Sequence, residues 1–99
     1  MKQYLTPEQT AKLIELGFEP STRVPFEVAN DELGYTFSIG ELIEMLPRGY
    51  DGELLEISAV ILSYTKWMVR YPHGIITYKA ELIDALYDML IMLKEEGEI

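Results

Sequence analysis

The sequence contains no cysteine and only one histidine in 99 residues. Without cysteine the chain can form neither a disulfide nor a thiolate metal site, so nothing requires an oxidising compartment. A single imidazole leaves no second ligand of the kind that structural zinc sites use. We therefore expect no metal and no cofactor, and a fold that is stabilised by a hydrophobic core.

Positive charge is also scarce, with 8 Lys and Arg against 17 Asp and Glu and a formal net charge of −9. Affinity for nucleic acid rests largely on lysine and arginine at the phosphates, so we expect no direct nucleic-acid binding. The same charge favours solubility and suits an acidic face directed at a basic partner.

Long apolar runs are missing as well. No basic segment followed by an apolar stretch opens the chain, and no run approaches the roughly 20 apolar residues of a transmembrane helix. We expect neither a signal peptide nor a membrane partner, and by default a cytoplasmic protein. The length and the 25% charged and 48% hydrophobic content are typical of a single globular domain spanning residues 1–99.

Catalytic and binding motifs are absent too. Gly49 and Gly52 are not followed by the lysine and hydroxyl residue of a phosphate-binding loop. Ser38 is better explained as a helix cap than as a nucleophile. Asp84 and Asp88 lack the spacing of a calcium-binding EF-hand. The sequence therefore assigns no catalytic, cofactor-binding or metal-binding residue.

The strongest pattern that is present is an amphipathic helix over residues 80–96, closed by Gly97. Its apolar side chains recur at intervals of three and four and form one broad face: Leu82, Ile83, Leu86, Met89, Leu90 and Leu93. Its acids follow a narrow stripe on the opposite side, which we expect to face water: Glu81, Asp84, Asp88 and Glu95. The broad face predicts a helix that packs across a sheet or among several elements.

Two earlier helices are predicted from their ends. Residues 6–9 (TPEQ) and residues 38–41 (SIGE) are capping boxes, in which a hydroxyl and a glutamine or glutamate cap the first turn. The first helix should stop at Gly17 and the second at Pro47.

Strands are indicated between the helices. Residues 24–28 alternate and residues 35–37 are β-prone, which suggests a hairpin. Residues 53–62 follow the turn-like segment 48–52 and are apolar on both faces, as in a central strand covered on each side. A short apolar run can also be helical, and periodicity alone does not decide between the two. Residues 66–71 and 75–77 complete a meander. The predicted fold is α+β, in the order α-β-β-α-β-β-β-α, with a small, mainly antiparallel sheet and the long C-terminal helix on one face.

Three blocks, about a third of the chain, carry a resemblance: residues 5–9 (LTPEQ) with 12–18 (KLIELGF), residues 38–47 (SIGELIEMLP) and residues 81–88 (ELIDALYD). In these blocks the sequence resembles small uncharacterised acidic proteins encoded in prophage and other mobile elements of gut Bacteroidetes. Residues 54–62 are more apolar than this resemblance implies. The resemblance implies a single α+β domain and a mobile-element origin, and it supplies no functional residue.

The first functional hypothesis is a non-catalytic accessory protein that binds another protein or a second copy of itself. Most of the seven tyrosines, three phenylalanines and one tryptophan should pack in the core or at its rim. Tyr50 and Tyr64 lie in predicted turns and could form an exposed patch, together with Met45 and Met68. In a variant of this hypothesis the acidic helix stripe presents carboxylates where DNA phosphates would sit.

The alternative hypothesis is a small enzyme or ligand-binding domain with a pocket near His73. Tyr71 and Tyr78 could act as phenolic partners of this imidazole. The simpler interpretation of the Pro-His-Gly segment is an exposed turn.

Overall fold

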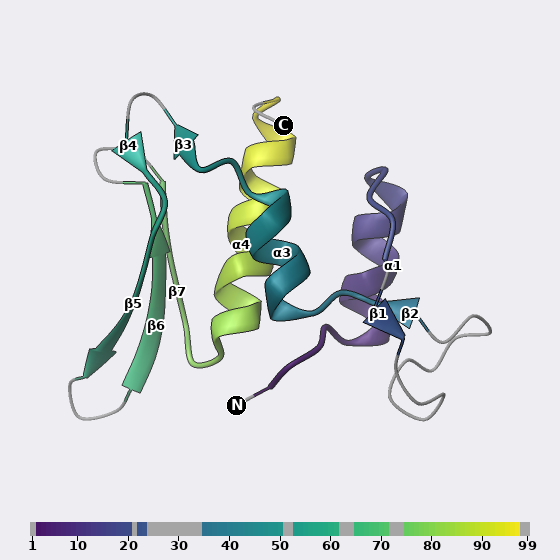
Figure 1. Cartoon of the computed structure of the whole chain (residues 1–99), viewed down its shortest axis with the longest axis horizontal. Coiled ribbons are helices and arrows are strands. Elements are labelled where there is room, and N and C mark those ends of the chain that lie inside the picture. The colour runs from purple at the N-terminus through teal and green to yellow at the C-terminus, as the bar shows by residue number, and fades with distance from the viewer. Residues whose placement is uncertain are drawn as a thin grey trace.

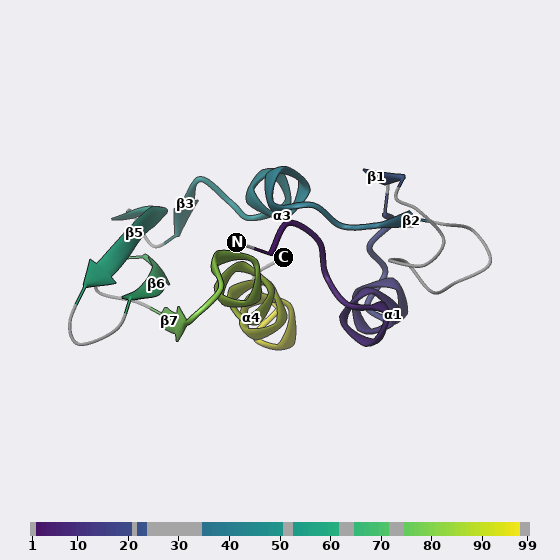
Figure 2. The same cartoon turned by 90° about the horizontal axis from the view of Figure 1, so that it is seen from below.

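Helix α4 (Leu82–Glu95) lies at the centre of the computed structural model (Figures 1 and 2). A three-stranded sheet packs on one side of α4, and helix α3 (Ile39–Met45) also packs against α4. The structure describes residues 2–20, 22–23, 35–50, 53–61, 65–71 and 75–97. Beyond α3, helix α1 (Pro7–Glu15) occupies the far end of the molecule from the sheet. The result is a flattened row of elements measuring 41 × 35 × 17 Å.

The predicted C-terminal helix is confirmed, with a shorter first turn. Glu81 has extended backbone angles (φ −109°, ψ 133°), so the helix starts at Leu82. It ends before Gly97, whose φ of 78° is the left-handed conformation expected for that stop. Leu86 and Leu90 are completely buried. The broad apolar face is needed because α4 contacts strands β6 and β7 as well as α3.

Both predicted capping boxes are present at the starts of α1 and α3. The Gln9 backbone N–H donates to Thr6 Oγ1 at 3.2 Å, and the Glu41 N–H donates to Ser38 Oγ at 3.2 Å. Gly17, with φ of 101°, follows the end of α1, and α3 ends ahead of Pro47. Local sequence alone is therefore sufficient to define these two helices.

The sheet is the predicted antiparallel meander of β5 (Glu56–Ile61), β6 (Thr65–Arg70) and β7 (Ile76–Lys79), in that order. Ile57 pairs with Val69, and Val69 with Thr77, so these three residues share the face that packs on α4. The prediction of a central strand over residues 53–62 is wrong, because β5 is an edge strand of the described sheet and β6 lies in the middle.

The same segment is also interrupted. Residues 53–61 form two strands, the two-residue strand β4 (Glu53–Leu54) and β5, and Leu55 lies between them. The Leu55 N–H donates to the Arg48 carbonyl at 2.8 Å. Leu54 is 74% exposed and Ala59 is exposed, so these two apolar residues are not covered by other parts of the described structure.

Two short strand pairs flank the second helix. Strand β1 (Thr22–Arg23) pairs with β2 (Tyr35–Thr36), and the predicted partner strand, residues 24–28, lies outside the described residues. Strand β3 (Gly49–Tyr50) lies within the segment 48–52 that was predicted as a turn, and it pairs with β4, which follows that segment.

One core joins both ends of the chain. Leu5, Leu13 and Phe37, from the N-terminal half, belong to the same buried cluster as the apolar face of α4, Val69 and Tyr71. Buried polar groups are paired: no buried side-chain nitrogen or oxygen among the described residues lacks a hydrogen-bond partner. The α+β class and the packing of the last helix on one sheet face thus agree with the sequence.

Candidate functional site

Of the two tyrosines predicted to form an interaction patch, the structure describes only the backbone of Tyr50. Tyr64 lies outside the described residues, and Tyr50 contributes its backbone to β3 while its side chain lies outside the described part. Met45 is half-buried beside the core and Met68 is buried in β6. Neither methionine is an exposed contact.

The acidic stripe of α4 was predicted to face water. In the structure, several of its carboxylates also contact other parts of the chain. The backbone N–H of Lys2 donates to Glu81 Oε2 at 2.8 Å, and Lys2 Nζ forms an ion pair with Asp84 at 2.8 Å. Asp88 forms an ion pair with Lys79 at 3.3 Å, whereas Glu95 is exposed. Three of the four predicted carboxylates therefore contact other parts of the chain.

Asp84 is the centre of this contact between the chain ends. Its Oδ1 accepts from Gln9 Nε2 at 2.9 Å in addition to the Lys2 ammonium. Partial burial alone raises the pKa of Asp84, but the hydrogen bonds from Gln9 and Lys2 and the charges of Lys2 and Lys79 outweigh it, so the pKa lies below its usual value.

This lowered pKa predicts acid-dependent stability. A carboxyl whose folded-state pKa is depressed contributes its stability above the unfolded-state pKa of about 3.9 and loses it as pH falls through the folded-state value. Asp84→Asn should lower the free energy of unfolding by about 1 kcal/mol at neutral pH, and the difference should close as pH falls through the lowered folded-state pKa of Asp84. Urea denaturation across this pH range measures it.

Glu95→Gln is the control for that series, since this position of α4 is exposed. It should change stability by less than about 0.5 kcal/mol at any pH. A deficit in Asp84→Asn that stays constant down to the lowest pH would show that the carboxylate charge is not what stabilises the contact.

The alternative hypothesis is a pocket near His73 with Tyr71 and Tyr78 as partners, and Tyr71 is buried in the core. His73 lies outside the described residues, and Tyr71 is 1% exposed, with its hydroxyl donating to the Pro47 carbonyl. Burial raises the pKa of Tyr71 to about 12. Tyr78 is 48% exposed and pairs with Met68, which places it on the opposite sheet face from Tyr71. The two tyrosines therefore do not face a common site.

In the described ranges no group of three or more histidine, aspartate or glutamate side chains is placed to hold a metal ion. None of the described helices is both long and apolar enough to cross a membrane.

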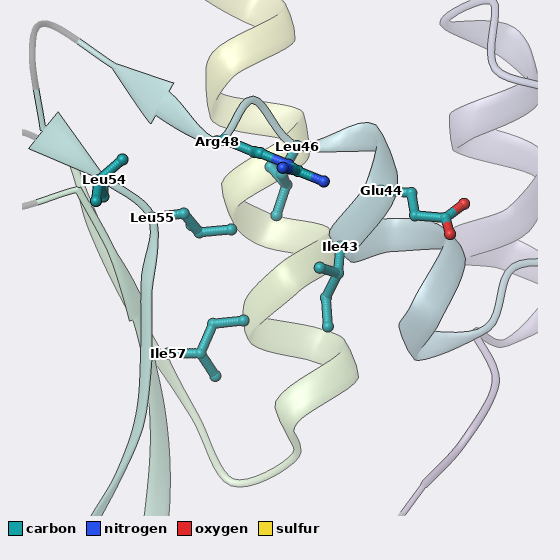
Figure 3. Close-up of a pocket in the computed structure, with 7 residues that line it drawn as sticks. All are labelled: Ile43, Glu44, Leu46, Arg48, Leu54, Leu55 and Ile57. Carbon is teal, nitrogen blue, oxygen red and sulfur yellow. The ribbon is translucent and has the colours of Figure 1, made fainter.

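A groove of about 540 Å³ opens between α3 and the strands β4 and β5 (Figure 3). This volume is in the range of about 300–1,000 Å³ that is usual for ligand sites. Its walls are mainly aliphatic, and Figure 3 shows Ile43 and Ile57 pointing into it from opposite sides. The lining residues are Ile43, Glu44, Leu46, Arg48, Leu54, Leu55 and Ile57.

The groove leaves apolar side chains open to solvent. Leu54 is 74% exposed and Ile43 is 37% exposed, while Leu55 and Ile57 are half-buried and Leu46 is buried. A single exposed leucine carries little information, but apolar side chains that meet around one concavity indicate a binding surface. We call these five residues, together with the space between them, the α3–β5 groove.

Both walls of the groove are fixed by the surrounding structure. The capping box at Ser38 and the stop before Pro47 set the ends of α3, and the Tyr71 hydroxyl holds the Pro47 carbonyl. The hydrogen bond from Leu55 to the Arg48 carbonyl ties the strand wall to the segment that leaves α3. The groove is thus pre-formed, which lowers the entropic cost of binding.

Charges of both signs lie at its rim. Arg48 extends across one end of the groove toward α3 (Figure 3). Glu44 also lines a neighbouring depression of about 320 Å³ with Glu19, Glu41 and Met45. Glu19 and Glu44 form no ion pair with another described residue.

Sequence reasoning missed the α3–β5 groove. The available signal was the excess of apolar residues over residues 54–62, which we interpreted as burial on two faces. The two exposed residues of the groove are Ile43, in the predicted second helix, and Leu54, in the predicted strand over residues 53–62. Nothing in the sequence indicates that these two elements lie side by side.

No protein-family model, curated protein or solved structure matches this chain. The resemblance to mobile-element proteins of gut Bacteroidetes therefore stays a prediction.

Proposed function

We propose that this protein is a non-catalytic binding protein that recognises another protein through the α3–β5 groove. The observation that carries the proposal is the exposure of Leu54 and Ile43 at the edge of a pre-formed aliphatic concavity. Exposed apolar side chains cost solubility, and on a monomeric domain such a concavity is typical of an interaction site.

The chemistry of the lining favours binding over catalysis. Glu44 and Arg48 are the only charged residues among the described lining residues, and no serine, threonine, cysteine or histidine accompanies them there. A catalytic site normally places an acid or base within reach of a nucleophile or an oxyanion-stabilising donor. The lining supplies apolar area and a charged rim, which is the anatomy of a protein interface.

The test is a selection of peptides from a random displayed library on the purified protein. Each enriched peptide is then titrated by calorimetry against a double variant, Ile43→Ser with Leu54→Ser, which removes the exposed apolar groups without changing the charge. Peptides that bind the groove should lose affinity about tenfold or more, since each truncated aliphatic group contributes on the order of 1 kcal/mol.

The matched control is the double variant Ile76→Ser with Tyr78→Ser on the outer sheet face, where these side chains are 40% and 48% exposed. Binding should be unchanged in this variant. Enriched peptides that are insensitive to the groove substitutions, or that depend on Ile76 and Tyr78, would contradict the proposed function, as would a failure to enrich any peptide.

A further inference from the structure

Strand β5 forms one wall of the α3–β5 groove and is also the open edge of the described sheet. In an antiparallel sheet each residue of an edge strand directs its N–H and C=O either to the neighbouring strand or outward, in alternation. Half of the residues over Glu56–Ile61 therefore present backbone donors and acceptors away from β6. The groove and the open backbone edge are adjacent.

This edge lacks the features that normally protect such strands. Natural edge strands carry lysine, proline, a bulge or an inward-pointing charge, each of which prevents another strand from pairing. The β5 sequence is EISAVI, and its only charge, Glu56, is occupied by Arg70 at 3.1 Å. Six paired residues from Glu56↔Arg70 to Ile61↔Thr65 run without interruption, so the strand is regular. Among the described residues no strand pairs with this edge of β5, so it is a template for a further strand.

We propose that the ligand is an extended segment of a basic partner protein, which adds to the edge of β5 as a fourth strand and points alternate aliphatic side chains into the α3–β5 groove. This inference rests on the proposed function and specifies the binding mode and the chemistry of the partner. Successive side chains of a strand point to opposite faces, so every second residue of the segment would lie over Leu55 and Ile57, and the residues between would face solvent.

The basic character of the partner follows from charge. The chain carries a net charge of −9, and Glu19 and Glu44 lie beside the groove without ion pairs to described residues. A lysine or arginine at the end of the segment that crosses α3 would meet these carboxylates. The same net charge opposes pairing of β5 with the β5 of a second copy, because two copies would bring like charges together.

The probe is an acetylated and amidated peptide of sequence Lys-Val-Thr-Val-Thr-Val-Thr-Lys. Its capped ends carry no charge, and a lysine at each end lets either strand direction place a cation near α3. We expect saturable binding by calorimetry that is lost in the Ile43→Ser, Leu54→Ser double variant and kept in the Ile76→Ser, Tyr78→Ser double variant.

Backbone N-methylation identifies strand addition. In a strand the valine N–H groups point to one edge and the threonine N–H groups to the other, so methylating one set blocks pairing with β5 while methylating the other set faces solvent. One of the two methylated peptides should lose affinity about tenfold or more, and the other should bind within about threefold of the parent. Equal effects of both sets would overturn strand addition.

Charge reversal tests the partner class. Glu44→Lys should weaken the probe about fivefold or more, and replacing both peptide lysines with glutamates should weaken it at least as much. If Arg48→Gln weakens binding and Glu44→Lys strengthens it, the groove selects an anionic ligand and the proposal is wrong. A stable dimer of the free protein in sedimentation, dissociated by Leu54→Ser, would identify a second copy as the occupant and also overturn it.

These outcomes are distinct from failure of the proposed function. Peptides selected from the random library that bind through the groove but show no N-methylation asymmetry would leave a protein-binding groove in place and remove only the extended, basic ligand.

Discussion

Replacing Leu86 with alanine will lower the free energy of unfolding by about 3–5 kcal/mol, the upper part of the range for large-to-small core substitutions. Leu86 is completely buried on α4, the helix that contacts both the sheet and α3. A cavity at this position cannot collapse easily, because it is enclosed by elements that are themselves packed on one another. Since domains of this size are stable by about 5–15 kcal/mol, the loss would be a large share of the total.

Urea denaturation followed by far-UV circular dichroism measures this effect, with Ile14→Ala as the control. Ile14 lies on α1 and is 48% exposed, so its truncation should cost less than about 1 kcal/mol. If Leu86→Ala costs no more than Ile14→Ala, α4 is not the centre of the core.

Phe37→Ala will destabilise the protein by about 3–5 kcal/mol, and the sheet at the other end of the molecule will report the loss. Phe37 is completely buried and follows β2, in the part of the molecule near α1. Trp67, the only tryptophan, lies in β6 and is half-buried against the same core cluster. If one core joins these regions, unfolding should be two-state for the whole chain.

The measurement compares urea transitions of Phe37→Ala by Trp67 fluorescence and by circular dichroism. We expect both to shift together to lower urea. A fluorescence midpoint that stays at the wild-type value while the helical signal moves would mean that the sheet and the α1 region unfold as separate units.

The helices could be predicted because their signals are local. The capping boxes at Thr6 and Ser38 each lie within four consecutive residues, and the periodicity of residues 80–96 requires only that one face be buried. Helix formation in these segments depends on neighbours in sequence, so the predicted and observed boundaries differ by at most a turn.

The position of β5 could not be predicted in the same way. An apolar strand at the centre of a sheet and one at an edge beside a groove have similar compositions, and strand order is decided by which distant segments pair. Leu54, Leu55 and Ile57 line the groove opposite α3, and sequence patterns do not encode the proximity of that helix.

The partners of the acidic stripe could not be predicted for a related reason. Helical periodicity correctly placed Asp84 away from the main apolar face, but Lys2 approaches it from 82 residues earlier in the chain. Periodicity describes the helix alone, whereas the partners of its polar side are set by the path of the N-terminal segment. The candidate site, which depends on such long-range neighbours on both walls, was for this reason inaccessible from sequence.

The most direct test of a peptide-binding α3–β5 groove is a methyl-labelled NMR spectrum of the protein with the lysine–valine–threonine probe. Contacts between the valine methyls of the peptide and the methyls of Ile43, Leu54 and Ile57, with no contact to Ile76, are the expected result. Contacts confined to Ile76 on the outer sheet face, or no intermolecular contact at saturating peptide, would contradict it.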